Sequence, residues 1–202
     1  MRQKFSSFFF LLLLSLMVIQ PALVHADGEM AKQALEDFMT TLRNLEFTPE
    51  REALDPALLD QANQYLDLQS MVVSALNESW DDASEDQKKQ FMDVMWKLIE
   101  KVAYPQSKTF LGDLEIEYDE PEQMDEGYEI VTVIKKEEEA LDIEAVYLLR
   151  EMDQHWKVYD VILDGVSMIE DLSYQFKTII KESSFDGLLV RMNEKLAEVS
   201  KA

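Results

Sequence analysis

The spacing of apolar residues changes along this chain at Pro105, and this change limits the folds open to it. Before Pro105, apolar side chains recur every three or four residues, which is the spacing of one face of an α-helix. After Pro105 they alternate with polar residues, as in a β-strand with one buried face. The spacing of apolar residues therefore predicts helices before Pro105 and a sheet after it.

Three helical segments are expected before Pro105, over residues 30–45, 56–80 and 84–104. The third has the clearest start, because Ser84 and Gln87 have the spacing of a capping box that satisfies the first free amides of a helix. Proline lacks an N–H and clashes with the preceding turn, so Pro105 is expected to end this helix after Tyr104.

Four strands are expected after Pro105, over residues 111–118, 128–135, 141–150 and 156–163. Short turns over 136–139 and at Asp153 and Gln154 predict antiparallel hairpins. Two closing helices are expected over residues 166–181 and 186–199, with Ser183 and Ser184 between them. This order predicts an α+β fold, with helices packed on one face of a curved antiparallel sheet of about four strands.

The amino terminus has the pattern of a secretory signal peptide. Arg2 and Lys4 precede an apolar run of about twelve residues over 8–19, which is shorter than the roughly twenty residues of a membrane-spanning helix. Val24 and Ala26 are small residues at the positions that signal peptidase reads. We expect cleavage after Ala26 and prefer this to an uncleaved anchor.

Cleavage there would leave residues 27–202 as a single domain, since no linker or repeat divides them. The chain has no cysteine, so its stability must come from a packed core. Removing residues 1–26 takes away two of 19 basic residues and none of the 41 acidic ones, and changes the formal net charge from −22 to −24. Such acidity argues against nucleic acid and anionic membrane surfaces as direct partners.

Residues for chemical catalysis are scarce. The mature chain keeps one histidine, His155, in an expected turn, and without cysteine it cannot build a zinc site. Gly165, Val166 and Ser167 begin like a nucleophile elbow, but Ile169 stands where the second glycine belongs. No catalytic residue, metal or cofactor is expected, and an enzyme is the least favoured class.

The segment from Trp156 to Phe176 joins a strand to an amphipathic helix. Apolar residues occupy both faces of the strand, so both faces need cover. Asp164 and Gly165 break the strand, and apolar residues then follow from Val166 at roughly helical spacing.

This segment resembles the periplasmic phospholipid-binding proteins of the Mla pathway, the MlaC or toluene-tolerance family. Those proteins carry an aromatic residue, a basic residue, a Tyr-Asp-Val run and a Gly-Val-Ser turn in the order found here, at Trp156, Lys157, Tyr159, Asp160, Val161, Gly165, Val166 and Ser167. Gln87, Phe91 and Phe176 also follow the family's order, so the resemblance covers nearly the whole mature chain.

The resemblance implies a soluble periplasmic carrier for phospholipid that maintains outer-membrane lipid asymmetry. Its implied partners are an inner-membrane ABC transporter with a ring-forming lipid-binding subunit and an outer-membrane lipoprotein complex. In the family the lipid tails lie between sheet and helices while the headgroup stays near solvent, so little headgroup selectivity is expected. The expected lining of the cavity is Phe91, Met95, Leu98, Ile130, Ile143, Tyr147, Val158, Tyr159, Phe176 and Ile180.

Two other binding or structural roles fit the same pattern. A carrier for another apolar lipid, such as a hopanoid or a sterol-like lipid, would differ in the shape of its pocket. A ligand-free periplasmic adaptor would have the same helices and sheet around a filled core. The family pattern does not account for the acidity of the chain. Because of this acidity, we expect recognition by a basic surface of the partner.

Overall fold

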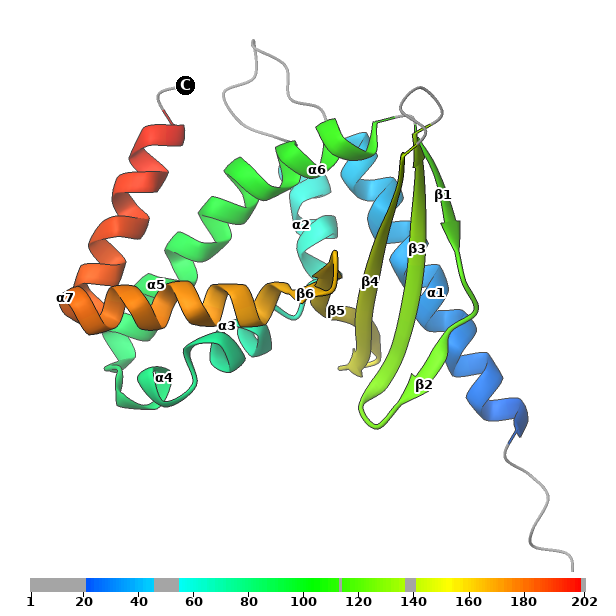
Figure 1. Ribbon diagram of the computed structural model, residues 1–202, viewed down its shortest axis with the longest axis horizontal. Coiled ribbons are helices and arrows are strands. Elements are labelled where there is room, and N and C mark those ends of the chain that lie inside the picture. Colours follow the sequence, from blue (N-terminus) through cyan, green and yellow to red (C-terminus); the bar gives the residue numbers. More distant parts are fainter. Residues whose placement is uncertain (1–20, 46–54, 113, 137–140, 201–202) are drawn as a thin grey trace, which may run out of the picture.

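The computed structural model describes residues 21–45, 55–112, 114–136 and 141–200 (Figure 1). The elements follow the order α1 (Pro21–Asn44), α2 (Pro56–Gln64), α3 (Leu68–Leu76), α4 (Glu78–Asp82), α5 (Glu85–Leu98), a π-helical turn η1 (Ile99–Ala103), α6 (Tyr104–Leu111), β1 (Glu115–Tyr118), β2 (Glu122–Met124), β3 (Gly127–Lys136), β4 (Leu141–Met152), β5 (His155–Leu163), β6 (Val166–Ser167) and α7 (Met168–Val199). The predicted α+β class is confirmed. Residues 1–20 of the expected leader over 1–26, and residues 137–139 of the expected turn over 136–139, lie outside the described residues.

The described strands form one antiparallel sheet in the order β1-β3-β4-β5-β6, with β2 also paired to β3. The four expected strands correspond to β1, β3, β4 and β5, and the sequence pattern missed β2 and β6, which have only three and two residues. Positive φ angles at Asp153 and Gln154, and at Asp164 and Gly165, make both connections two-residue hairpin turns. The predicted turn at Asp153 and Gln154 is thus confirmed.

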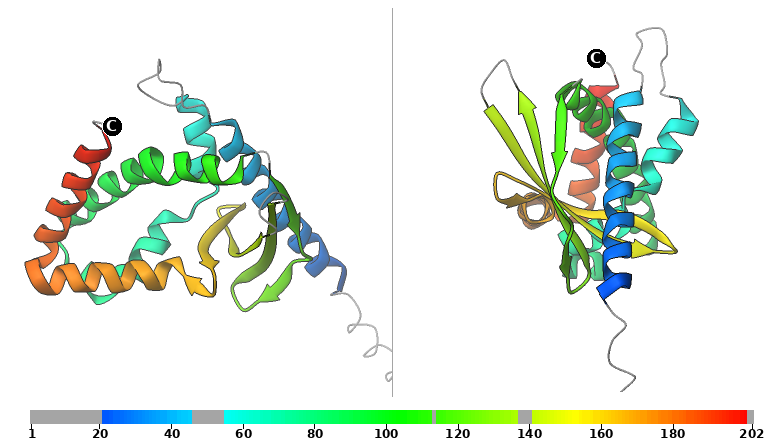
Figure 2. Two further views of the ribbon diagram at one scale, coloured as in Figure 1. Left: turned by 45° about the horizontal axis from the view of Figure 1, so that its top comes forward. Right: turned by 90° about the vertical axis from the view of Figure 1, so that its right-hand side faces the viewer.

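Helix α1 lies along one face of the sheet (Figure 2), and together with α2 and α6 it encloses the first core cluster. On β3 the alternate residues Tyr128, Ile130 and Ile134 are buried against this layer. On α1, Leu35 and Phe38 belong to the same cluster. Alternation along the strand and helical spacing along α1 therefore bury two matching apolar surfaces.

A second core cluster lies among α3, α4, α5 and α7, which extend away from the sheet (Figure 1). Its centre is Phe91, which is fully buried. The ring centroids of Phe176 and Phe185 lie 5.4 and 5.9 Å from that of Phe91, and the Trp80 ring stands edge-on at 6.4 Å. Ile99 packs against both clusters and joins them.

The expectation that Pro105 ends the third helix is wrong. The predicted capping box of Ser84 and Gln87 does start α5, but the helix then continues through η1 into α6. In η1 the Tyr104 N–H bonds to the Ile99 carbonyl, five residues back, and Pro105 is the second residue of α6. Helix therefore extends to Leu111, and the first strand begins only at Glu115.

The last helix begins later than expected and is bent as expected. Val166 and Ser167 form β6, and Ser167 caps α7 by accepting a hydrogen bond from the Glu170 N–H. Ser183 and Ser184 have non-helical backbone angles, which confirms the predicted break between two helical halves.

Candidate functional site

An apolar pocket of about 430 Å³ opens among α3, the continuous α5–η1–α6 helix and α7. Thirteen of the sixteen described residues that line it are apolar, among them Leu68 and Val72 of α3, Leu98 of α5, Val102 of η1, and Leu172 and Met192 of α7. The other three are Gln106, Gln175 and Lys195, and all three are exposed. The pocket therefore has an apolar wall and a polar margin.

The aromatic centre of the second core closes the pocket on one side. Phe176 lines the pocket, and its ring meets the ring of Phe91 edge-to-face. Helices α5 and α7 carry apolar residues three and four positions apart, as in Met95 and Leu98 of α5. On each helix, one apolar stripe therefore faces the aromatic cluster and the pocket. The aromatic cluster thus packs beside the aliphatic part of the pocket wall.

The π-helical turn supplies part of the pocket wall. Ile99, Val102 and Ala103 all line the pocket. Beside them, the Tyr104 hydroxyl donates to Asn63 Oδ1 at 2.8 Å, and Asn63 Nδ2 donates to Glu100 Oε1 at 3.0 Å. Burial, and to a lesser degree the charge of Glu100, raises the pKa of Tyr104 far above its usual range, so this donor stays protonated. Such turns are frequent at functional sites.

A buried carboxylate positions the start of α7. Asp160 on β5 accepts hydrogen bonds from the Ile169 N–H at 3.2 Å and from the Ser167 hydroxyl at 2.5 Å. These contacts hold the turn after β5 against the strand it has just left. Met168 and Leu172 are thereby directed to the pocket, and two residues of the family signature acquire a structural role.

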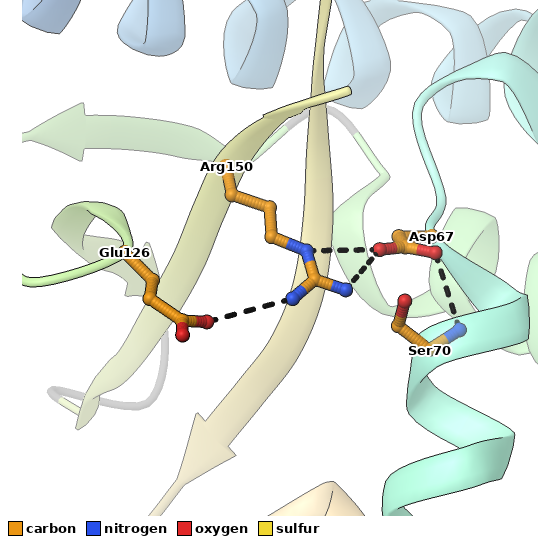
Figure 3. Close-up of polar contacts among 4 residues, drawn as sticks. All are labelled: Asp67, Ser70, Glu126 and Arg150. Atoms are coloured by element: carbon orange, nitrogen blue, oxygen red, sulfur yellow. Dashed lines mark hydrogen bonds and ion pairs between the residues drawn. The ribbon is translucent and has the colours of Figure 1, made fainter. Parts of the chain in front are cut away.

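An ion pair fastens α3 to the sheet (Figure 3). The Asp67 carboxylate caps α3 through the Ser70 N–H and accepts hydrogen bonds from Arg150 Nε at 3.0 Å and Arg150 Nη2 at 2.5 Å. Burial alone would raise the pKa of Asp67, but the bonds from Arg150 and Ser70 outweigh it and hold the pKa below its usual value. The Arg150 guanidinium also lies 3.6 Å from Glu126.

Backbone hydrogen bonds hold the chain before α3 against β5. The Asp67 N–H donates to the Val158 carbonyl at 2.9 Å, and the Val158 N–H donates to the Tyr65 carbonyl at 2.8 Å. The α3 wall of the pocket therefore cannot move far from the sheet without breaking these bonds and the ion pair of Asp67.

The profile of the MlaC protein family matches residues 32–194, which is most of the chain and includes every wall of the pocket except Lys195 at its margin. The chain belongs to the MlaC family. A solved structure of a phospholipid-binding protein from Ralstonia solanacearum, in complex with a phospholipid, superposes with a TM-score of 0.68. It is 18% identical and the match covers 86% of this chain and 98% of that one, so the two proteins share the MlaC fold. No match was found among curated proteins.

Five of the ten residues expected to line the cavity of this MlaC protein lie in its helical half. Met95, Leu98 and Phe176 line the pocket, and Phe91 is buried behind Phe176. Ile180 lines a separate hollow between α4, α5 and the bend of α7.

The other five expected residues come from the sheet. Ile130, Ile143, Tyr147 and Val158 belong to the first core cluster, on the sheet face that meets α1. Tyr159 lies at an irregularity in the pairing of β4 with β5, and the Arg150 guanidinium carbon stands 5.0 Å from its ring centroid. The structure therefore divides the expected set between two layers of the MlaC fold.

Several lining residues were absent from the expected set. Leu172 and Met192 belong to apolar helical stripes that the sequence shows, so their spacing could have marked them. The spacing of Leu68 and Val72 indicated an apolar helix face, but nothing in the sequence indicated that this face of α3 would lie opposite α7. Gln106 and Lys195, like Gln175, carry no local signal, because a polar residue at a pocket margin has the pattern of any exposed helical residue. Among the described residues, no helix has the length and hydrophobicity to cross a bilayer.

Proposed function

We propose that this protein is a phospholipid carrier that binds acyl chains in the pocket among α3, α5 and α7. The observation that supports this best is the pocket itself, whose wall is apolar in a member of the MlaC family. The fold it shares with a protein solved with a phospholipid supports the same ligand class. The carrier shuttles lipid between the outer membrane and an inner-membrane ABC transporter.

The physical need for such a pocket follows from the cost of exposing acyl chains. Each methylene left in water costs about 0.8 kcal/mol, and a phospholipid has on the order of thirty of them. The pocket volume of about 430 Å³ would enclose part of these acyl chains. A passive carrier binds and releases at both ends of its path, so the direction of transport is set by its partners.

We further propose that the carrier works in the periplasm after cleavage behind Ala26. Ala26 and Asp27 are exposed, whereas Gly28 is buried and a Cβ there would lie 3.1 Å from the Tyr128 ring. Ala31 is fully buried. A cut after Ala26 would therefore leave the buried residues Gly28 and Ala31 in place. The mass of the protein recovered from the periplasm tests this site.

The proposed partners are a ring-forming lipid-binding subunit of the ABC transporter at the inner membrane and a lipoprotein complex at the outer membrane. Together they would return phospholipid from the outer leaflet and maintain lipid asymmetry. Membership in the MlaC family supports these partners. Reconstitution with each complex, followed by transfer of labelled phospholipid between two vesicle populations, tests them.

The ligand is tested by native mass spectrometry of protein purified without detergent, followed by extraction and lipid analysis. We expect a bound mass of phospholipid size that extraction removes. A hopanoid or sterol-like mass would replace the phospholipid proposal by the other carrier role. A ligand-free mass that also refuses added phospholipid would favour the adaptor.

The location of the ligand is tested by filling the pocket. Ala103 is exposed on the pocket wall, so Ala103→Trp adds bulk there without creating a cavity elsewhere. Ala57→Trp, at an exposed position of α2 away from the pocket, is the matched control. We expect the first variant to lose most of its copurified lipid and the second to keep it. Equal lipid content in both variants would contradict this site.

A further inference from the structure

The polar margin of the pocket differs in its charged residues from the chain as a whole. The protein has 41 acidic and 19 basic residues, yet Lys195 is the only charged residue among the described residues that line the pocket. Gln106 and Gln175 are the other polar residues of the described lining. The described lining at this margin offers one ammonium and two carboxamides, which can donate hydrogen bonds to an anion.

We propose that this margin is a phosphate subsite, in which Lys195, Gln106 and Gln175 receive the phosphodiester of the bound lipid. The inference rests on the proposed function, because it places the headgroup end of the same ligand. It departs from the low selectivity that the resemblance implies, since the protein would distinguish phosphate-bearing lipids from uncharged lipids with the same chains.

The geometry of the helices supports this assignment. Lys195 and Gln175 come from the two halves of α7, on either side of the bend at Ser183 and Ser184, and Gln106 comes from α6. All three side chains are exposed, whereas Phe176 and Met192, their neighbours on the pocket wall, are buried. Acyl chains placed against the buried residues would leave the headgroup beside the exposed part of the lining, where these three side chains supply the polar groups of the described lining.

The chemistry of the three side chains fits a phosphodiester. A lysine ammonium offers three donors, and each glutamine amide offers two. In the described structure the Lys195 ammonium lies 3.1 Å from Glu198 and its side chain is 54% exposed. An exposed ion pair of this kind contributes little, so a phosphate can compete with Glu198 for the ammonium.

The experiment compares two dioctanoyl lipids with identical chains, phosphatidylglycerol and diacylglycerol, by titration calorimetry on delipidated protein. We expect the unmodified protein to bind phosphatidylglycerol more tightly. Lys195→Gln should weaken the binding of phosphatidylglycerol by roughly three- to tenfold and leave the affinity for diacylglycerol unchanged. Lys195→Arg, which keeps the positive charge, should retain most of the affinity.

Two control variants separate the subsite from the general charge of the protein. Lys181→Gln makes the same charge change at an exposed position of α7 outside the pocket lining, and should not alter the preference. Glu198→Gln removes the ion pair but keeps the ammonium, so it should bind phosphatidylglycerol as tightly or more tightly.

Three results would overturn the inference. Equal affinity of the unmodified protein for both lipids would remove the preference to be explained. Equal weakening by Lys195→Gln and Lys181→Gln would assign the effect to overall charge. Binding of neither lipid would overturn the proposed function as well, whereas binding of both with equal affinity would leave it standing.

Discussion

Buried polar side chains stand at the junctions that shape the pocket. Asp67 joins α3 to the sheet, and Asp160 joins β5 to the start of α7. Tyr104 joins the end of η1 to α2 through Asn63. Each of these groups has hydrogen-bond partners, which is what burial of a polar atom requires. Single substitutions at these residues therefore test how the walls of the pocket are held.

Asp67→Asn is expected to lower the free energy of unfolding by about 1 to 3 kcal/mol. Asparagine keeps a side-chain oxygen for the Ser70 N–H, so the cap of α3 survives, but it removes the charge that Arg150 faces. Urea unfolding measures the change. Glu126→Gln, which removes the exposed partner of the same guanidinium, is the control and should cost much less.

The same variant should change the pH dependence of stability. Because the pKa of Asp67 is lower in the folded protein than in the unfolded chain, its stabilisation is present above the unfolded pKa of about 4 and is lost as pH falls. Between about pH 5 and pH 2 the unmodified protein should lose more stability than Asp67→Asn. Parallel pH profiles would contradict a stabilising role for the charged form of Asp67.

Tyr104→Phe should lower the free energy of unfolding by about 1 kcal/mol at neutral pH, because Asn63 loses its donor. Burial raises the pKa of Tyr104, so its contribution is present below the unfolded pKa of about 10 and is lost as pH rises above it. The variant should therefore lose less stability above pH 10 than the unmodified protein does. Tyr174→Phe alters a 74% exposed ring and should follow the unmodified protein in both respects.

Two irregular helical elements surround the pocket. The α5–η1–α6 helix contains a π-turn whose residues face the pocket, and α7 is bent so that both of its halves do so. A straight α7 continuing its first half could not place Phe176 and Met192 on one wall around the same space. The bend at Ser183 and Ser184 is therefore part of the architecture of the site.

Ser184→Gly should raise the free energy of unfolding. Ser184 has φ 68° and ψ 176°, a region that is nearly restricted to glycine and costs other residues about 1 to 3 kcal/mol. Glycine removes this strain but adds about 0.5 to 1 kcal/mol of chain entropy, so we expect a net gain of roughly 1 kcal/mol in thermal or urea unfolding. Ser173→Gly, in regular helix, should instead destabilise, and an equal loss in both variants would contradict strain at the bend.

At the scale of the molecule, the described chain has two cores that meet at Ile99. One lies between α1 and the sheet, and the other lies among the helices around Phe91. The pocket belongs to the helical core, while the sheet serves as the frame that holds α3 and the start of α7.

Lipid binding should therefore protect the two cores unequally. Ligand at a hundredfold excess over its dissociation constant stabilises the folded state by about 2.7 kcal/mol. In hydrogen exchange on delipidated protein, added phospholipid should slow exchange most in α3, α5 and α7 and least in β3 and β4. Protection centred on α1 and the sheet would instead place the lipid beside Ile130, Ile143 and Tyr147.

After removal of residues 1–26, the chain has a formal net charge of −24, which is a property of the whole molecule and not of one site. If docking uses a basic partner surface, the association rate with either membrane complex should fall steeply as salt is raised, because screening shortens the range of attraction to a few ångströms. Surface plasmon resonance at several salt concentrations measures this. An association rate that does not change with salt would contradict electrostatic docking.

The sequence by itself determined the four longer strands, the start of α5 and the bend of α7, but the single helix expected over 56–80 is three helices, α2, α3 and α4. Helical spacing, the capping box at Ser84 and the hairpin turn at Asp153 are local properties, and local hydrogen bonding and burial patterns encode them. The signature around Asp160 and Ser167 also pointed to the family, whose fold the structure has. Short strands such as β2 were missed because three residues carry too little periodicity to detect.

Only the tertiary structure decided where the pocket lies. Periodicity shows that a residue faces inward but not which element it meets. Leu98, with helical spacing, and Ile130, in an alternating strand, were both expected to line one cavity, yet they lie in different cores. The path through Pro105 depended on the bond from Tyr104 to Ile99, which no local pattern predicts. Lys195 acquired its place at the pocket margin because the bend of α7 brings it there, a non-local consequence of packing.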